Sequence, residues 1–229
     1  TPLWGLDTFQ TVDAIRKEAQ DKKLSISVIG PAGERRVAIA CISVDKHSFA
    51  GRGGLGAVMG AKNLKAVAVR GTQKVEVHHL GSAAELIKKY RQHMLKTVKE
   101  NGFMAHGTPG LCVTAEGLGD MPLKYWEGDV FPDGAKKLGA PNYTEVLKAK
   151  PLPCKYCPIG CHRSITITEP QEYAQVGIGP EYETLGMMGT NCLIHDPKAV
   201  AKANEIANKL GIDTISSGAM VGFAMECFE

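Results

Sequence analysis

Short apolar runs separated by polar or glycine-containing turns fill the first third of the chain. Residues 8–22 carry their apolar side chains at helical spacing, which predicts a helix there. Four apolar runs predict β-strands, at residues 25–29, 37–44, 64–69 and 74–77. We therefore expect a sheet-forming unit in this part of the chain.

The pattern becomes helical near residue 80. Ser82 and Glu85 have the spacing of a capping box, which predicts a helix from there to about Asn101. Residues 102–141 are rich in glycine and proline and predict long loops with short helices. Two further helices are expected, one starting at Asp196-Pro197 and ending at Gly211, and one over residues 214–228 capped by Asp213.

Composition narrows the class of protein. Of 229 residues, 44% are hydrophobic and 22% are charged, as in ordinary globular proteins. The net charge is only +3, so we expect no nucleic-acid partner. No apolar stretch approaches the roughly 20 residues that a membrane helix requires, so we expect no membrane insertion.

Three of the seven cysteines lie within eight residues, in the segment CKYCPIGC. Cys154, Cys157 and Cys161 can converge because Pro158 and Gly160 turn the backbone between them. Thiolates on a tightly curved loop are the ligands of an iron–sulfur cluster. A cube normally takes four cysteines, and the fourth ligand has three candidate sources, which are Cys41, Cys192 and sequence beyond residue 229.

A zinc site is the alternative interpretation of the same segment. Its ligands would be the three cysteines and His162, although binding by the adjacent Cys161 and His162 would strain the backbone. Thiols that bind no metal are the remaining alternative.

A glycine-rich stretch begins at Gly51 with the sequence GRGGLG. It matches the dinucleotide fingerprint G-x-G-x-x-G, but only about eight residues separate Gly56 from the next expected strand, and a parallel crossover needs about a dozen. The stretch therefore predicts a phosphate-binding loop of another kind, with charge from Arg52 and Lys62. A tight corner between strands is the alternative.

The segment GPEYETLG places Glu181 and Glu183 on either side of Tyr182. Such a pair of carboxylates can transfer protons, provided that the site buries one of them and so favours its protonated form. The alternative is structural, since acidic residues are common in the first turn of a helix.

Together these segments resemble the tungsten-dependent aldehyde ferredoxin oxidoreductase family. The resemblance is carried by GRGGLGAVMGAKNLKAVAVRG at 51–71, CKYCPIGC at 154–161, GPEYETLG at 179–186 and LGIDTISSG at 210–218. It implies an α+β fold and a chain that is the central portion of a longer polypeptide. Residues 1–79 would be the end of a β-rich, pterin-cradling N-terminal domain, and residues 80–229 a partial α-helical domain that carries the cysteine motif.

The resemblance also implies cofactors and their ligands. They are tungsten held by two pyranopterins, Mg²⁺ that bridges the pterin phosphates, and a [4Fe–4S] cluster; because the sulfur ligands come from the pterin, molybdenum is possible. Arg52, Gly53, Gly54, Lys62 and Asn63 would line a pterin phosphate, and Asp213 would hydrogen-bond a pterin ring. Cys154, Cys157 and Cys161 would bind the cluster, and Tyr182 and Glu183 would lie near the metal, with Glu183 transferring a proton.

The implied activity is oxidation of a small aldehyde to a carboxylic acid, with electrons passing through the cluster to a ferredoxin-like acceptor or to other redox subunits. A cytoplasmic location is expected. One alternative is the tungsten-containing catalytic subunit of an ATP-independent benzoyl-CoA reductase, and another is a non-catalytic zinc-binding module.

Overall fold

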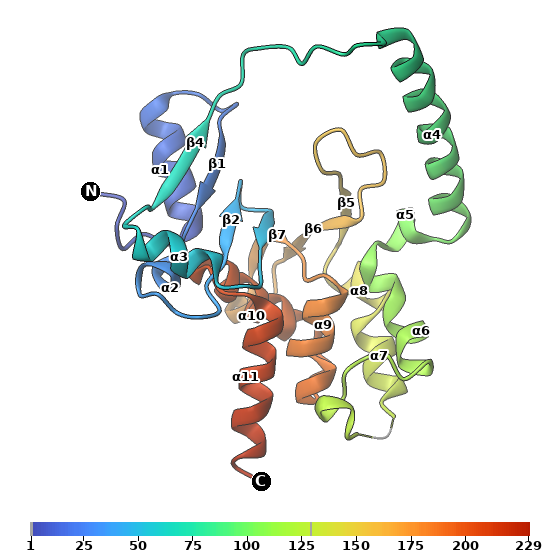
Figure 1. Cartoon of the computed structure of the whole chain (residues 1–229). Coiled ribbons are helices and arrows are strands. Elements are labelled where there is room, and N and C mark those ends of the chain that lie inside the picture. Colours follow the sequence, from blue (N-terminus) through green and yellow to red (C-terminus); the bar gives the residue numbers. More distant parts are fainter. Residues whose placement is uncertain (1, 129) are drawn as a thin grey trace.

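The N-terminal part of the computed structural model, which describes residues 2–128 and 130–229, is built on a four-stranded sheet (Figure 1). The strands are β1 (Ser25–Val28), β2 (Ile42–Val44), β3 (Ser48–Ala50) and β4 (Ala66–Val69). Their order is β3-β2-β1-β4, and all three pairs are antiparallel. This arrangement contains no parallel crossover, which agrees with the rejection of a dinucleotide fold.

Three helices accompany this sheet: α1 (Thr8–Ala19), α2 (Pro31–Glu34) and α3 (Leu55–Ala61). Asp7 caps α1 in a complete capping box with Gln10, and Val12 of that helix is buried against Ile26 and Val28 of β1. The shorter helices α2 and α3 pack backbone to backbone, because a β-carbon on Gly60 would lie 1.8 Å from the carbonyl oxygen of Gly33.

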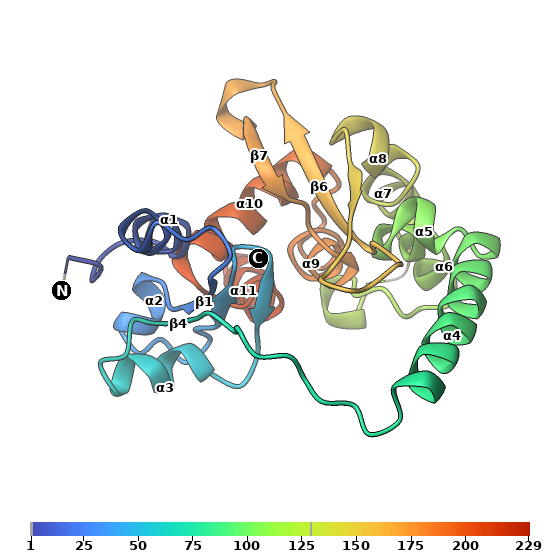
Figure 2. The same cartoon turned by 90° about the horizontal axis from the view of Figure 1, so that it is seen from above.

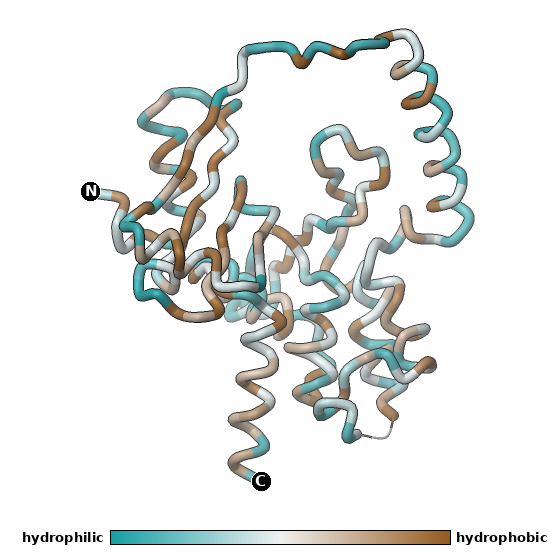
Figure 3. Tube along the Cα trace, in the orientation of Figure 1, coloured by the Kyte–Doolittle hydropathy of each residue, from teal (hydrophilic) through white to brown (hydrophobic). Residues whose placement is uncertain are grey.

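A long extended connection leads from β4 to α4 (Leu80–Glu100), and it is largely hydrophilic (Figures 1 and 3). Within α4, only Val98 is buried. None of the described helices has both the length and the apolar character that crossing a membrane requires.

The second half of the chain, from residue 103 onward, combines short helices with a three-stranded antiparallel sheet of order β5-β6-β7. Its strands are β5 (Lys150–Leu152), β6 (His162–Ile167) and β7 (Gln175–Ile178). The helices are α5 (Phe103–His106), η1 (Thr108–Leu111), α6 (Cys112–Gly117), η2 (Lys124–Trp126), α7 (Pro132–Leu138), α8 (Asn142–Val146), η3 (Gln171–Tyr173), α9 (Tyr182–Met188), η4 (Thr190–Cys192), α10 (Pro197–Leu210) and α11 (Thr214–Glu226). One core cluster joins these elements and includes Leu138, Tyr143, Ile165 and Leu185, all of which are almost fully buried.

The junction between α10 and α11 ties the two halves together. The N–H of Cys41 donates to the carbonyl of Gly211 at 2.9 Å, and the N–H of Asp213 donates to the carbonyl of Ile39 at 3.0 Å. Ala40 and Ile212 form an isolated antiparallel bridge between these bonds. Seen from above, α11 is viewed along its axis between the N-terminal sheet and α9 (Figure 2).

The α+β fold class is confirmed, but four local predictions were wrong. The helix after residue 80 starts at Leu80 with His79 as its cap, so Ser82 and Glu85 lie inside it. Residues 74–77 form no strand, because they belong to the exposed connection and have no partner strand. The second half of the glycine-rich stretch is α3 rather than a loop, and β2 begins at Ile42 instead of residue 37.

Candidate cofactor site

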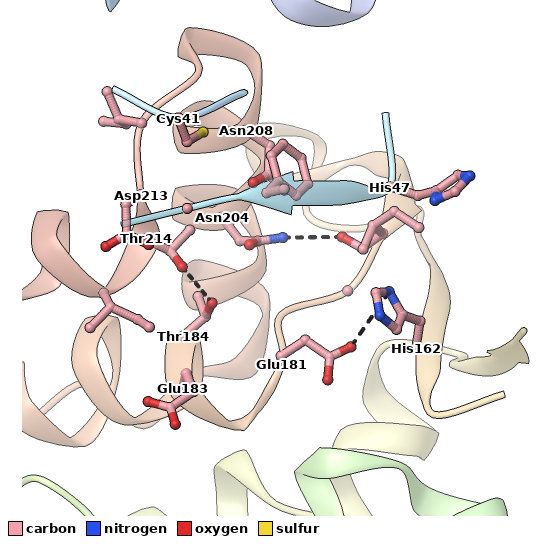
Figure 4. Close-up of a pocket in the computed structure, with 16 residues that line it drawn as sticks. Cys41, His47, His162, Glu181, Glu183, Thr184, Asn204, Asn208, Asp213 and Thr214 are labelled. Carbon is pink, nitrogen blue, oxygen red and sulfur yellow. Dashed lines mark hydrogen bonds and ion pairs between the residues drawn. The ribbon is translucent and has the colours of Figure 1, made fainter. Parts of the chain in front are cut away.

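A cavity of about 230 Å³ lies where the two halves meet (Figure 4). One wall comes from the β2–β3 region, and the others come from the starts of β6, α9 and α11 and from one face of α10. Its polar lining residues are Cys41, His47, His162, Glu181, Glu183, Thr184, Asn204, Asn208, Asp213 and Thr214. Glu183 and Asp213, which the family resemblance predicts as site residues, therefore lie in one cavity.

Glu183 and Tyr182 are neighbours in α9 but point to different surroundings. Glu183 lines the cavity with an exposed side chain. Tyr182 packs against the core of the second half, and its hydroxyl donates to the carbonyl of Asp120 at 3.5 Å. Burial, with smaller contributions from Asp120, Cys112 and Glu183, raises the pKa of Tyr182 to about 12. The phenol is therefore protonated at neutral pH.

Glu181, the residue before α9, takes part in a small polar network. Its carboxylate accepts a hydrogen bond from the hydroxyl of Thr108 and lies 4.0 Å from Nδ1 of His162. The same Thr108 oxygen accepts the backbone N–H of Tyr182 at 3.0 Å. The hydrogen bonds of Thr108 tie the start of α9 to η1, and the approach of His162 to Glu181 brings an imidazole to the cavity wall (Figure 4).

Asp213 is 7% exposed and caps α11 as predicted. Its Oδ2 accepts the N–H of Ser216 at 2.8 Å and the hydroxyl of Ser216 at 2.6 Å. Its other oxygen faces the glycine-rich loop, since a β-carbon on Gly51 would lie 2.9 Å from Oδ1. Asp213 also adds to the effect of burial in raising the pKa of the Cys41 thiol to about 12.

Two buried asparagines in the cavity were missed by the sequence analysis. Asn204 is 4% exposed and donates from Nδ2 to the carbonyl of Ile178 at 3.1 Å, and Asn208 is 5% exposed. They are four residues apart on the same face of α10 as Val200, Ala201 and Ala207. Amides on an otherwise apolar helix face were the sequence signal that could have identified this wall.

The predicted phosphate ligands separate into two groups. Arg52, Gly53 and Gly54 precede α3, where Gly53 (φ +92°) and Gly54 (φ +68°) have left-handed backbone conformations. Lys62 and Asn63 follow the opposite end of this seven-residue helix, about 10 Å away along its axis. All except Gly54, which is half-buried, are exposed. The structure therefore does not bring the five residues to one point.

The three motif cysteines lie on the loop between β5 and β6, whose end residues Leu152 and His162 are paired (Figure 1). Within the loop, the N–H of Cys157 donates to the carbonyl of Cys154 at 3.0 Å and forms a turn. Cys154 is exposed, and Cys157 and Cys161 are half-buried. Burial raises the pKa of the Cys161 thiol, and Glu181, Cys154 and Cys157 add to that rise through their negative charge. The three cysteines therefore share one short loop between two paired strands.

The cysteine loop and the main cavity share two histidines. His47 and His162 line the main cavity and also line a smaller one of about 30 Å³ together with Leu152, Pro153 and Cys154. His47 comes from the turn between β2 and β3, so no spacing in the sequence relates it to the cysteines. A group bound at the cysteines would lie beside a group bound in the cavity.

The other cysteines are in different surroundings. Cys192 is buried, and its thiol donates to the carbonyl of Met187 at 3.5 Å. Across residues 2–128 and 130–229, no three His, Cys, Asp or Glu side chains are arranged as a ready-made metal site. The fourth ligand of the cluster and the alternative zinc set therefore both stay predictions.

Comparison with known proteins identifies the family of this chain. A family model described as "Aldehyde ferredoxin oxidoreductase, domains 2 & 3" matches residues 84–229, and one described as "Aldehyde ferredoxin oxidoreductase, N-terminal domain" matches residues 1–71. The chain belongs to the aldehyde ferredoxin oxidoreductase family. This confirms the resemblance that the four sequence segments indicated.

Similar proteins include the tungsten-containing aldehyde ferredoxin oxidoreductase of Pyrococcus abyssi (strain GE5 / Orsay), which is 38% identical over 237 residues. That match covers 99% of this chain and 37% of the relative. An aliphatic sulfonate oxidoreductase, WOR-like subunit, of Pyrococcus furiosus (strain ATCC 43587 / DSM 3638 / JCM 8422 / Vc1) is 26% identical over 100% of this chain and 38% of its own length. The chain thus spans little more than a third of the length of these relatives.

A solved structure shares the fold. It is described as the "Active site complex BamBC of Benzoyl Coenzyme A reductase in complex with 1,5 Dienoyl-CoA". The match has a TM-score of 0.75 and 24% identity, and it covers 97% of this chain and 35% of the other. This member of the aldehyde ferredoxin oxidoreductase family therefore has the same fold as that structure over nearly its whole length.

Proposed function

We propose that this chain is part of a tungsten–pterin oxidoreductase that oxidises an aldehyde to a carboxylic acid and passes electrons through a [4Fe–4S] cluster to ferredoxin. The observation that carries the proposal is the cavity that contains Glu183 and Asp213 and shares His47 and His162 with the cysteine loop. A redox cofactor in the cavity and a cluster on the loop would be neighbours, as electron transfer between them requires.

The residues present fit both groups. Cys154, Cys157 and Cys161 supply soft thiolate ligands on one short loop, the donor type that iron–sulfur clusters use. Their side chains would move together on binding, since metal binding and local folding are coupled. At the cavity, Gly51 leaves space beside Asp213 that a side chain would fill. The bound tungsten centre supplies the two-electron redox chemistry, and the protein supplies position and electrostatics.

Arg52, Gly53 and Gly54 would contact a pterin phosphate, because their loop continues directly from Gly51 at the cavity wall. Asp213 would accept a hydrogen bond from a pterin N–H at Oδ1, since Oδ2 is occupied by Ser216. Lys62 and Asn63 stay a prediction for a separate phosphate contact at the other end of α3, and Mg²⁺ between the phosphates stays a prediction as well.

Oxidation of an aldehyde with one water to a carboxylic acid releases two electrons and two protons, and Glu183 would accept and release one of these protons. Its exposed carboxylate lines the cavity and is not engaged in an ion pair within the described part of the chain. Tyr182 would have a supporting role, since its protonated phenol points toward Asp120. The tyrosine would therefore orient the start of α9 and leave proton transfer to Glu183.

The test is an assay of the full-length anaerobically purified enzyme with a panel of aldehydes and, in parallel, with benzoyl-CoA, with ferredoxin or a viologen dye as the electron acceptor or donor. Aldehyde-dependent reduction of the acceptor is expected, and Glu183→Gln should lower kcat by about 100-fold or more. Glu76→Gln, in the exposed connection, is the matched control and should retain activity.

The second candidate is the catalytic subunit of a benzoyl-CoA reductase, which is favoured by the shared fold with the BamBC complex. Reduction of benzoyl-CoA without any aldehyde activity would establish this candidate and contradict the first.

A further inference from the structure

Arg163, the second residue of β6, is the largest fully buried side chain of the described protein, with 1% of its surface exposed. Its backbone is held on both sides. It pairs with Pro151 of β5, and its carbonyl accepts the N–H of Gly179 at 2.8 Å. The position of this side chain is therefore fixed by the sheet that carries the cysteine loop.

The guanidinium group is only partly satisfied. Nη2 donates to the carbonyl of Met104 at 3.1 Å and more weakly to that of Phe103 at 3.4 Å. Nε and Nη1 are buried without a hydrogen-bond partner, and no ion pair to a carboxylate is formed within residues 2–128 and 130–229. A buried charge without a partner is strongly unfavourable, so such a group calls for a counter-charge.

The cysteine motif lies directly beside this group. Gly107 is packed between the two, because a β-carbon there would lie 2.3 Å from the carbonyl oxygen of Cys161 and 2.8 Å from Nε of Arg163. The packing of Gly107 against both residues therefore places the partly unsatisfied guanidinium next to the loop that carries the three cysteines.

We propose that Arg163 is the buried counter-charge of the iron–sulfur cluster and sets its reduction potential. This inference rests on the proposed binding of a cluster by Cys154, Cys157 and Cys161. A cluster with thiolate ligands is an anion, and each electron that enters adds one negative charge. The fixed guanidinium favours the reduced form and so raises the potential. It acts as a positioning and tuning residue, since it binds no iron itself.

The test compares the holoenzyme with its Arg163→Gln and Arg163→Lys variants by redox titration monitored by EPR. Removal of the charge in Arg163→Gln should shift the cluster midpoint to a more negative potential, and Arg163→Lys, which keeps the charge, should retain a midpoint near that of the wild type. Arg70→Gln, which removes an exposed arginine paired with Asp21, is the control and should leave the midpoint unchanged. An Arg163→Gln enzyme with full iron content and the wild-type midpoint would overturn the inference.

A measurement on the wild type keeps the inference testable if the glutamine variant does not fold. Holoenzyme labelled with ¹⁵N-arginine should show a guanidinium nitrogen coupling to the reduced cluster in pulsed EPR, and Arg163→Lys should remove it. Absence of the coupling in iron-loaded wild-type enzyme would overturn the inference alone. If the purified wild-type enzyme contains no iron, that result would instead contradict the proposed function, so the two failures are distinct.

Discussion

Gly51 and Asp213 are in contact at the wall of the cavity, since a β-carbon on Gly51 would lie 2.9 Å from Oδ1 of Asp213. The two residues are far apart in the sequence, one in the glycine-rich loop and the other at the start of α11. Their contact places the glycine-rich motif and the last motif of the chain at one wall.

Asp213 allows its structural and binding roles to be separated. Asp213→Ala removes the cap of α11 and should lower the free energy of unfolding by about 1 kcal/mol. Asp213→Asn retains a good capping residue but removes the charge at Oδ1, so it should keep stability and lose pterin content. Urea unfolding and pterin fluorescence after denaturation measure the two effects. Equal pterin content in the asparagine variant and the wild type would remove Asp213 from the site.

The cysteine loop gives a spectroscopic prediction. Cys157→Ser should abolish the visible absorbance of the cluster and lower its iron content, because serine is a poor substitute for a thiolate ligand. Cys227→Ser, which changes an exposed cysteine outside the loop, should leave both unchanged. Retention of absorbance and iron by Cys157→Ser would contradict the cluster assignment.

The α2–α3 contact gives a stability prediction. Gly60→Ala places a β-carbon 1.8 Å from the backbone oxygen of Gly33, so the helices must move apart. We expect a loss of about 3 kcal/mol in the free energy of unfolding. Gly71→Ala has no atom within 4 Å of the new β-carbon and should change stability by less than about 0.5 kcal/mol. Urea unfolding of both variants checks this, and equal stabilities would show that α2 and α3 are not packed so closely.

Glu205 gives a pH prediction. Burial alone would raise the pKa of its carboxyl, but hydrogen bonds from Lys202 and Lys209, each 2.7 Å long, outweigh that effect and lower the pKa. A lowered pKa in the folded state means that the stabilisation is full above the unfolded value of about 4.3 and is lost as the pH falls. Glu205→Gln should therefore cost about 0.5 kcal/mol at pH 7 and progressively less as the pH falls through the lowered pKa of the folded state.

Thermal melts of wild type and Glu205→Gln across this pH range measure the difference. Glu18→Gln, at an exposed position, is the control. A difference between wild type and Glu205→Gln that stays constant with pH would show that the two lysines do not stabilise the ionised carboxylate.

Local chemistry made part of this structure predictable. Asp196, Gly211 and Asp213 mark helix ends because caps depend on a few adjacent residues, and all three predictions were confirmed. The cysteine motif also lies within a short stretch of sequence, and its role in binding a cluster stays a prediction. The sheet formed by β5, β6 and β7 was missed, although β6 alternates half-buried and buried residues, because its strands are short.

The rest depends on contacts between distant residues. His47 reaches the cysteine loop only because β2 and β3 are positioned by the junction of α10 and α11. Lys62 and Asn63 follow the glycine motif closely in sequence, yet α3 separates them from Arg52. No spacing in the sequence contains this information.

Elemental analysis of the anaerobically purified full-length protein tests the central claim most directly. The proposed function predicts tungsten, or molybdenum in its place, together with about four iron atoms for each such metal ion. One zinc ion with neither iron nor tungsten nor molybdenum would contradict the proposed function.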